Sequence, residues 1–255
     1  MLAWARWIRR QVGSLGRGTR SLLFRLQGGT RYRQRYYRRE LAEASRRGLE
    51  RSDISDHGST IFFHALAARP RLIVELGTRG GESTRTLLAA AAVAGADVLS
   101  IDRDDCSAVD SPHRDRWHFE RGDDVEFARD RFRAWCVSRG FPPTAEVIFV
   151  DTSHEFEHTR QELAAWLPLL SEQGVMILHD TNMGRGVYAR LDGSVDARGW
   201  DNKRGVIRAI EELMRASYSE NSVFADACGD FALLHYPFCN GLTVLRKLAG
   251  LDARR

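Results

Sequence analysis

The stretch "LIVELGTRGGEST", Leu72 to Thr84, decides the fold. It begins with apolar residues that favour a strand, meets an acid, and passes into a loop with three glycines. Glycine weakens a strand, but it allows positive φ and close approach of the backbone to a ligand. Glu82, Ser83 and Thr84 follow the loop and offer side chains that can cap a helix. The stretch therefore predicts a strand, a ligand-binding turn and a helix.

Strand and helix patterns alternate outward from this stretch. Such alternation predicts an α/β fold with a doubly wound, mostly parallel sheet that is covered by helices on both faces. Ligands bind such a sheet beyond the carboxyl ends of its strands, where the strand order reverses. We expect seven strands, at 72–76, 96–102, 117–122, 146–151, 174–180 and two within 222–236, and helices at 58–68, 82–93, 124–138, 156–169 and 203–217.

The first 51 residues differ from the rest in charge. They hold fourteen arginines and three acids, about +11, which leaves about −7 of the net +4 for the remainder. Their apolar residues recur at helical spacing, which predicts a basic helical N-terminal extension over 1–51, ahead of a catalytic domain over 52–255. Three interpretations stay open: a helix docked on its own domain or a dimer partner, contact of residues 1–40 with an anionic membrane, and an organellar transit peptide.

Composition limits the class of protein. No apolar run approaches 18 residues, so no membrane-spanning helix is expected. The four cysteines show neither metal-type spacing nor a CxxC motif, which is typical of thiols in a reducing compartment. We therefore expect a cytoplasmic protein, at most peripheral at the inner membrane surface.

The glycine loop differs from two common nucleotide-binding motifs. It lacks the second glycine of G-x-G-x-x-G, which weakens an NAD interpretation, and no Lys-Ser/Thr pair follows it, which excludes a P-loop. With Glu75, Gly77 and Gly81, "VELGTRGGES" resembles the first motif of class I S-adenosylmethionine-dependent methyltransferases, hydrophobic-E/D-x-G-x-x-x-G. The resemblance extends over roughly residues 56–237 and implies a Rossmann-like methyltransferase fold.

The resemblance also implies how the chain holds S-adenosylmethionine. The loop backbone would cradle the methionine part, Asp102 in "SIDRDD" would bind the ribose hydroxyls, and Asp123 in "ERGDD" would contact the adenine amine. Asp102 alone does not discriminate, because NAD ribose is held in the same way. Asp123 has an alternative role as a helix N-cap. The implied cofactor residues are Glu75, Gly77, Thr78, Gly80, Gly81, Ser83, Asp102 and Asp123.

Two later strands each end in an aspartate, Asp151 and Asp180. Two acids at one sheet edge repel unless a cation or proton lies between them, and hard oxygen ligands suit Mg²⁺ or Mn²⁺. Here the chain is similar to metal-dependent O-methyltransferases of the catechol type, and closer to a group with sugar O-methyltransferases and the cephalosporin hydroxylase family. This resemblance implies Asp151, Asp180 and Asn182 as metal ligands, with Thr181 or water as alternatives in the third position.

Histidines accompany both aspartates. His154 lies where the catechol type has its base, so Asp151 and His154 are the expected catalytic residues. An imidazole that is neutral near pH 7 accepts a proton, although His154 could instead orient a neighbour. We expect His179 to point away along its strand and His158 to be solvated. The long loop 182–205 is expected to bind the acceptor, or to act as a lid that excludes water.

The leading hypothesis is a Mg²⁺-assisted, S-adenosylmethionine-dependent O-methyltransferase. Its acceptor would be a hydroxyl of a sugar, glycan, glycolipid or natural product, with no specific nucleic-acid partner, and homo-oligomerisation stays open. The alternatives are an oxidoreductase or hydroxylase on a nucleotide-binding α/β fold, and a non-catalytic protein that binds membranes or polyanions through its basic extension.

Overall fold

The computed structural model describes residues 52–184, 186–197 and 199–248. The expected helical extension over 1–51, and any membrane contact through residues 1–40, lie outside these described residues. Within them, no helix combines the length and the apolar character that crossing a membrane requires.

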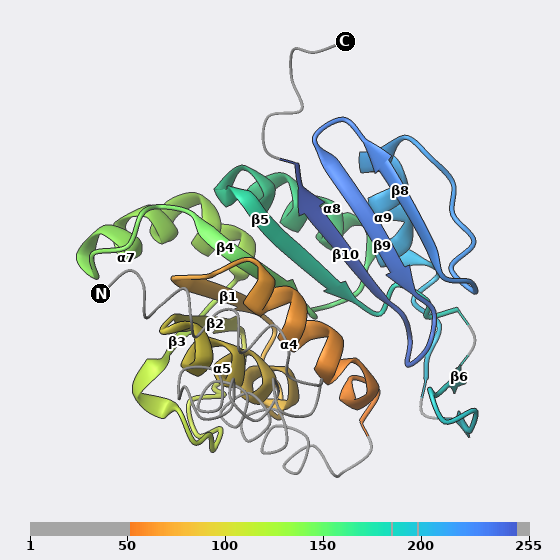
Figure 1. Cartoon of the computed structure of the whole chain (residues 1–255), viewed down its shortest axis with the longest axis horizontal. Helices are drawn as coiled ribbons and strands as arrows, with labels where there is room; N and C mark the ends of the chain where they lie inside the picture. Colours follow the sequence, from red (N-terminus) through yellow and green to blue (C-terminus); the bar gives the residue numbers. More distant parts are fainter. Residues whose placement is uncertain (1–51, 185, 198, 249–255) are drawn as a thin grey trace, which may run out of the picture.

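One sheet organises the chain, with the strand order β3-β2-β1-β4-β5-β10-β9-β8 (Figure 1). The first five strands of this order are parallel, and the last three join them antiparallel. From β1 the chain moves outward to β2 and β3 and then returns to β4, so the strand order reverses between β1 and β4. The strands are β1 (Leu72–Leu76), β2 (Asp97–Asp102), β3 (Trp117–Arg121), β4 (Ala145–Val150), β5 (Leu170–His179), β8 (Phe224–Cys228), β9 (Phe231–Tyr236) and β10 (Leu242–Lys247).

The predicted fold class is confirmed, but the sheet has eight strands rather than seven. The strand missing from the prediction is β10, which lies between β5 and β9 and bonds to both. Its sequence, "LTVLRK", is rich in β-branched and apolar residues, so the signal was present. A second, two-stranded sheet pairs β6 (Tyr188–Ala189) with β7 (Val195–Asp196) inside the predicted loop 182–205.

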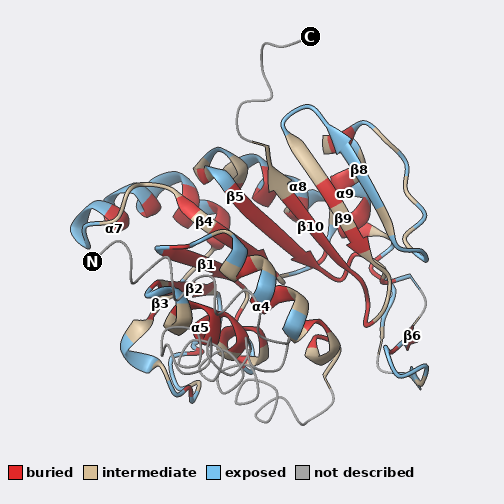
Figure 2. Ribbon diagram, in the orientation of Figure 1, coloured by how far each residue is buried: buried red, intermediate tan, exposed pale blue. Residues whose placement is uncertain are grey.

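Helices cover both faces of the sheet. Successive side chains of a strand point to opposite faces, so Ile73 joins a core with α4 and α5, while Val74 joins a core with α7, α8 and α9. Buried residues concentrate in the central strands, and β8 at the edge is mostly exposed (Figure 2). The helices are α4 (Gly58–Ala67), α5 (Glu82–Ala94), α6 (Asp124–Glu126), α7 (Phe132–Ser138), α8 (Phe156–Trp166) and α9 (Gly205–Met214).

The helix expected at 124–138 is interrupted. A π-helical turn, Phe127–Arg131, separates α6 from α7. Short 3₁₀ turns complete the described chain: η1 (Ser55–His57), η2 (Arg114–Arg116) and η4 (Leu167–Leu169). Of these, η1 matters for the site, because it carries His57 beneath the end of β5.

Candidate active site

The glycine turn after β1 lies directly against the end of β4. Asp151 N–H donates to the Leu76 carbonyl at 2.9 Å, and Gly77 has φ +85°. A Cβ at Gly77 would lie 2.1 Å from the carbonyl oxygen of Asp151, so no other residue fits there without moving the backbone. The sequence-predicted turn thus touches the first strand-ending aspartate.

Glu75 is fully buried beneath this turn. Its carboxylate accepts hydrogen bonds from the hydroxyls of Ser83 (2.7 Å), Thr84 (2.8 Å) and Ser100. The sequence offered Ser83 and Thr84 as helix caps. That expectation was wrong, because the two hydroxyls donate to Glu75 and α5 has no side-chain cap. Glu75 and Ser83 therefore hold the turn in place from behind.

Burial is the main reason that the pKa of Glu75 rises to about 7, with the negative charge of Asp151 adding to it. The three hydroxyl donors act in the opposite direction. A buried carboxyl with a raised pKa binds its proton more tightly in the folded chain than in the unfolded one.

Asp102, at the end of β2, accepts hydrogen bonds from the backbone of the same turn. One carboxylate oxygen accepts from the N–H groups of Thr78 (2.7 Å) and Arg79 (3.1 Å), and the other accepts from Asp104 N–H (2.9 Å). Burial opposes ionisation, but these three N–H groups together outweigh it and lower the pKa of Asp102. Asp102 therefore stays anionic, and each of its oxygens can accept a further hydroxyl hydrogen bond.

A cavity of about 240 Å³ opens beside Asp102, beyond the carboxyl ends of β1, β2 and β4. It lies where the strand order reverses, which is the expected ligand position in a doubly wound sheet. Of the predicted cofactor residues, Gly77 and Asp102 line it, and Asp151 joins them. Arg79, which the sequence analysis did not single out, also lines it.

The structure separates the two acids of "ERGDD". Asp123 caps α6, accepting from Glu126 N–H at 2.9 Å, and pairs with Arg103. Its alternative role as an N-cap is what the structure shows, and the acid that lines the cavity is Asp124. One oxygen of Asp124 is buried with no hydrogen-bond partner among the described residues.

His158 is not solvated as expected. Its ring nitrogens lie 2.8 Å from Ser153 Oγ and 3.3 Å from Asp124 Oδ1, and the side chain is 16% exposed. The hydrogen bond with Asp124 is the main cause that raises the pKa of His158. Glu162, one turn further along α8, accepts from Thr152 Oγ1 at 2.6 Å, and burial raises its pKa to about 8.

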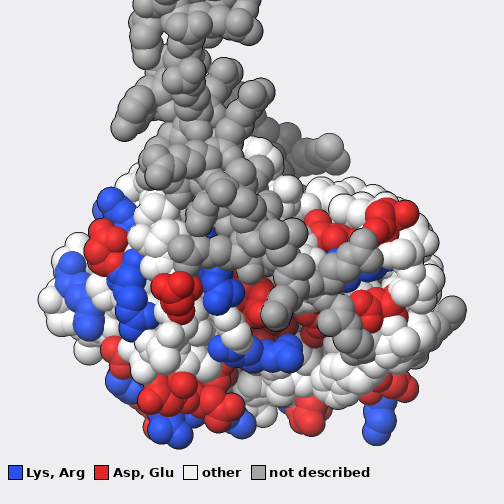
Figure 3. Space-filling view, turned by 90° about the horizontal axis from the view of Figure 1, so that it is seen from below, with Lys and Arg blue, Asp and Glu red and all other residues white. Residues whose placement is uncertain are grey.

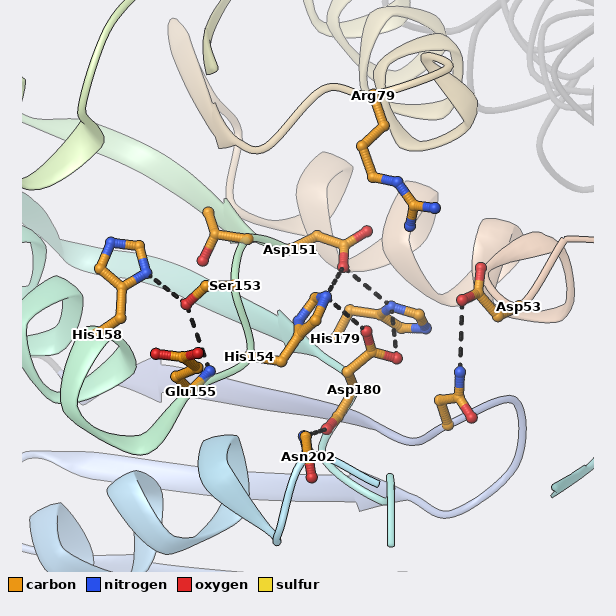
Figure 4. Close-up of polar contacts among 12 residues, drawn as sticks. Asp53, Arg79, Asp151, Ser153, His154, Glu155, His158, His179, Asp180 and Asn202 are labelled. Carbon is orange, nitrogen blue, oxygen red and sulfur yellow. Dashed lines mark hydrogen bonds and ion pairs between the residues drawn. The ribbon is translucent and has the colours of Figure 1, made fainter. Parts of the chain in front are cut away.

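The second strand-ending aspartate meets the first through two histidines (Figure 4). His154 Nε2 lies 3.0 Å from Asp180 Oδ2 and 3.9 Å from Asp151 Oδ1. His179 Nδ1 lies 3.3 Å from a carboxylate oxygen of each aspartate. The ligand atoms of Asp151, His154 and Asp180 all lie within 4.8 Å of one another. We call Asp151, His154, His179 and Asp180 the acid–histidine cluster.

His179 points into this cluster, contrary to the expectation from strand alternation. Strand β5 ends at His179, and Asp180 adopts a left-handed backbone conformation with φ +57°, so the alternation stops there. His154 also has positive φ, +59°. Such conformations are strained for residues other than glycine and collect at functional sites.

Charge in the cluster is unevenly distributed. Burial raises the pKa of Asp180 to about 8, and the charge of Asp151 adds to this shift. Burial alone would lower the pKa of His179, but the two aspartates outweigh it and raise the pKa to about 10. Burial lowers the pKa of His154. Near pH 7, Asp180 is therefore protonated beside a neutral His154.

The predicted third ligand, Asn182, lies elsewhere. Its side-chain N–H donates to the Pro237 carbonyl at 2.7 Å, and it lines a different cavity. Asn202 is the amide beside the cluster: it donates to the Asp180 carbonyl at 3.1 Å, and its Oδ1 is buried without a partner among the described residues. Sequence reasoning placed Asn202 in the loop but gave it no role at the cluster.

The cluster fits a divalent cation. One carboxylate oxygen of Asp180, itself 2% exposed, has no hydrogen-bond partner among the described residues. Two carboxylates with one imidazole suit Mn²⁺ as well as Mg²⁺. Asp53, a further acid that the sequence analysis did not identify, faces the cluster from the start of the described chain (Figure 4).

Seen from below, the described surface mixes acidic and basic side chains (Figure 3).

We expect the substitution Glu75→Gln to change how stability depends on pH. Glu75 keeps its proton in the folded chain up to about pH 7, whereas an unfolded chain releases it near 4.5. The folded state therefore binds more protons in this window, and the free energy of unfolding falls as pH rises through it, on the order of 3 kcal/mol. Urea unfolding at pH values from 4.5 to 8 should show that the free energy of unfolding falls less steeply with pH in Glu75→Gln than in the wild type.

The matched control for this measurement is Glu157→Gln. Glu157 lies on α8 with its side chain 64% exposed, so this variant should keep the wild-type slope. Equal slopes in wild type and Glu75→Gln would show that Glu75 is ionised in the folded protein throughout this range.

Comparison with known proteins agrees with this geometry. Residues 74–181 match a family model described as a methyltransferase domain. The matched region contains the glycine turn, Asp102 and both strand-ending aspartates. Comparison with curated protein sequences gives no match.

Solved structures share the fold at low sequence identity. The SAH-bound methyltransferase PaMTH1 of Podospora anserina has a TM-score of 0.51 at 18% identity, over 82% of this chain and 87% of that one. An O-methyltransferase from Bacillus cereus in complex with SAH has a TM-score of 0.51 at 17% identity, over 83% of this chain and 90% of that one. MycE of the mycinamycin pathway, in complex with Mg, SAH and mycinamycin VI, has a TM-score of 0.52 at 19% identity, over 85% of this chain and 56% of that one.

These likenesses establish the fold. Residues 74–181 match a family of methyltransferase domains, and the chain shares the fold of SAH-bound methyltransferases.

Proposed function

We propose that this protein is an S-adenosylmethionine-dependent O-methyltransferase that uses a divalent cation. The observation that carries this proposal is the double role of Asp151, which lines the cavity at the strand-order reversal and belongs to the acid–histidine cluster. A methyl donor in that cavity would lie next to the groups that can prepare an oxygen to attack it. Alignment of the two reacting groups is the main task that the protein performs, because the donor's methyl group is already activated.

The cavity residues suit an adenosine-containing cofactor. Gly77 lets the turn pack directly against the backbone of Asp151, and Asp102 presents an anionic carboxylate for the ribose hydroxyls. In place of Asp123, we assign the adenine amine to Asp124, whose buried oxygen lacks a partner among the described residues. The S-adenosyl cofactor of SAH-bound neighbours on the same fold supports this choice over NAD.

The acid–histidine cluster would hold the cation. Asp151 and Asp180 are the ligands that we propose, and Asn182 is not among them because its side chain turns to Pro237. When bound, Mg²⁺ or Mn²⁺ would lower the pKa of an acceptor hydroxyl and orient it. His154 Nε2 lies 3.0 Å from Asp180 Oδ2, so a neutral His154 beside the cation could accept the proton that the hydroxyl loses.

A hydroxyl on a sugar or natural product is the acceptor that we propose. One neighbour on this fold was solved with Mg, SAH and the natural product mycinamycin VI, which is consistent with that choice. We also propose that residues 1–51 are an extension separate from the methyltransferase domain, since their charge of about +11 contrasts with about −7 in the rest. Contact of residues 1–40 with an anionic membrane remains our proposal for its role.

Binding of the cofactor product tests the first step. Isothermal titration calorimetry should show SAH binding to the wild type and no NADH binding. Gly77→Ala should lower SAH affinity at least 100-fold, because its Cβ would collide with the Asp151 carbonyl. Gly95→Ala is the matched control: Gly95 has φ +75°, but nothing lies within 4 Å of a Cβ there. It should lose some stability and keep SAH affinity; tighter binding of NADH than of SAH would overturn the proposal.

Cation binding tests the assignment of ligands. Titration of Mn²⁺ followed by electron paramagnetic resonance should show at least tenfold weaker binding in Asp180→Asn than in the wild type, because a charged ligand is lost. Asn182→Ala should stay within about threefold of the wild type, since its amide faces Pro237. Equal weakening in both variants would restore Asn182 as a ligand.

Methyl transfer tests the function itself. With methyl-labelled S-adenosylmethionine, a panel of glycosides and Mg²⁺, label should appear in a base-stable ether on at least one acceptor. Excess EDTA should abolish transfer, and His154→Gln should slow it at least 100-fold at pH 7 through loss of the proton acceptor. Transfer that persists at the wild-type rate in excess EDTA would remove the cation from the proposal.

A further inference from the structure

Exposed apolar side chains gather on one loop near the cluster. Seven large hydrophobic side chains are exposed among the described residues, and four of them lie in the loop 182–205. Single exposed apolar residues are ordinary on a protein surface, but a group of them within one segment marks an interaction site. The four are Val187, Leu191, Val195 and Trp200, with exposed fractions of 51%, 62%, 70% and 49%.

Two of these side chains, Val187 and Val195, line a second cavity of about 690 Å³. Its walls come from the loop, from the residues before α9 and from the turn between β9 and β10. The lining also includes polar and charged residues, so the cavity offers hydrogen-bond partners together with an exposed apolar rim. These polar residues are Asn182, Asp201, Lys203, Arg204, Glu220 and Asn221.

Contacts connect the acid–histidine cluster to both cavities. The cavities share no lining residue among those described, yet Asp151 lines the first, and Asn182, two residues beyond Asp180, lines the second. Phe238 in the second cavity stacks on His57 at 4.7 Å, and the ring of His57 lies 5.7 Å from that of His179. A ligand in the second cavity would therefore lie against Phe238, which contacts the cluster through His57.

The loop that carries the apolar side chains is fastened to the domain. Arg190 is 6% exposed and donates to Ser55 Oγ at 2.8 Å and Asp56 Oδ1 at 3.0 Å. The next residue, Leu191, donates its backbone N–H to Asp56 Oδ2 at 3.0 Å. Arg190 thus anchors the loop that was expected to bind the acceptor. The flanking apolar side chains are held outward by an anchored loop, a placement that suits a ligand with an apolar part.

We propose that the second cavity binds an amphiphilic acceptor. Its hydroxyl-bearing part would occupy the polar cavity, and its apolar part would lie against Val187 and Val195 at the rim. This inference rests on the proposed function and narrows its acceptor to molecules that join a sugar-like group to an apolar chain or ring. Removal of apolar surface from water supplies the affinity for the second part, about fourfold for each methylene group that is fully buried.

Alkyl glucosides of different chain length test this proposal. Methyl, hexyl and octyl β-glucoside should each be titrated below the micelle concentration and with SAH present, and the heat of binding gives the affinity of each. Octyl glucoside should bind at least tenfold more tightly than methyl glucoside. The double variant Val187→Ser/Val195→Ser should reduce this ratio to threefold or less.

The matched control is Val137→Ser. Val137 lies on α7, is 67% exposed and lines neither cavity, so its variant should keep the wild-type ratio. Equal affinity of the three glucosides for the wild type, or equal loss in both variants, would overturn the proposal. A smaller oligomer of the double variant in sedimentation velocity would overturn it too, because a second copy would then cover the rim.

The same titrations separate this inference from the proposed function. SAH binding is measured first and reports on the cofactor cavity alone. Wild-type protein that binds SAH but shows no chain-length dependence would refute the amphiphilic acceptor and leave the proposed function intact. Failure to bind SAH would refute the proposed function itself.

Discussion

The contact between the glycine turn and the backbone of Asp151 is the constraint on which the site depends. Strands β1 and β4 are neighbours at the point where the strand order reverses, and the Asp151 N–H closes on the Leu76 carbonyl at 2.9 Å. Only a residue without a side chain fits at Gly77, so the cofactor cavity and the acid–histidine cluster meet at that point. Buried Glu75 accepts a hydrogen bond from Ser83 after the turn, and anionic Asp102 accepts one from the Thr78 N–H within it.

The charges of the cluster would change if the cation that we propose were bound. Two carboxylates face each other in a buried site, and the positive charge of His179 balances one of them. The second is balanced by the proton on Asp180, which burial and Asp151 retain there up to about pH 8. A divalent ion could replace that proton and bind the Asp180 oxygen that has no hydrogen bond among the described residues. The positive φ of Asp180 and His154 supports the same conclusion, because strain of this kind persists where a function requires it.

The sequence predicted the parts of the site that depend on strand ends. Asp102, Asp151 and Asp180 close three strands of one sheet, so topology alone brings them to one edge. Prediction from the sequence failed where local backbone geometry decides the direction of a side chain. His179 faces the cluster because Asp180 leaves the strand, and Asn182 turns to Pro237 because its backbone bonds to Asn240. Neither effect leaves a periodic signal, and the choice between Asp123 and Asp124 depends on which one caps a helix.

The reaction that we propose must take place where the two cavities come together. Methyl transfer requires the acceptor oxygen to touch the donor methyl group, so a donor beside Gly77 and an acceptor hydroxyl would have to meet at Asp151. Trp200 lies beside this point, with its ring 5.7 Å from that of His154. The ion pair of Arg190 with Asp56 fixes the loop that carries Trp200 to η1, the same turn that sets His57 against His179. One short turn at the start of the domain therefore positions both the acceptor loop and a wall of the cluster.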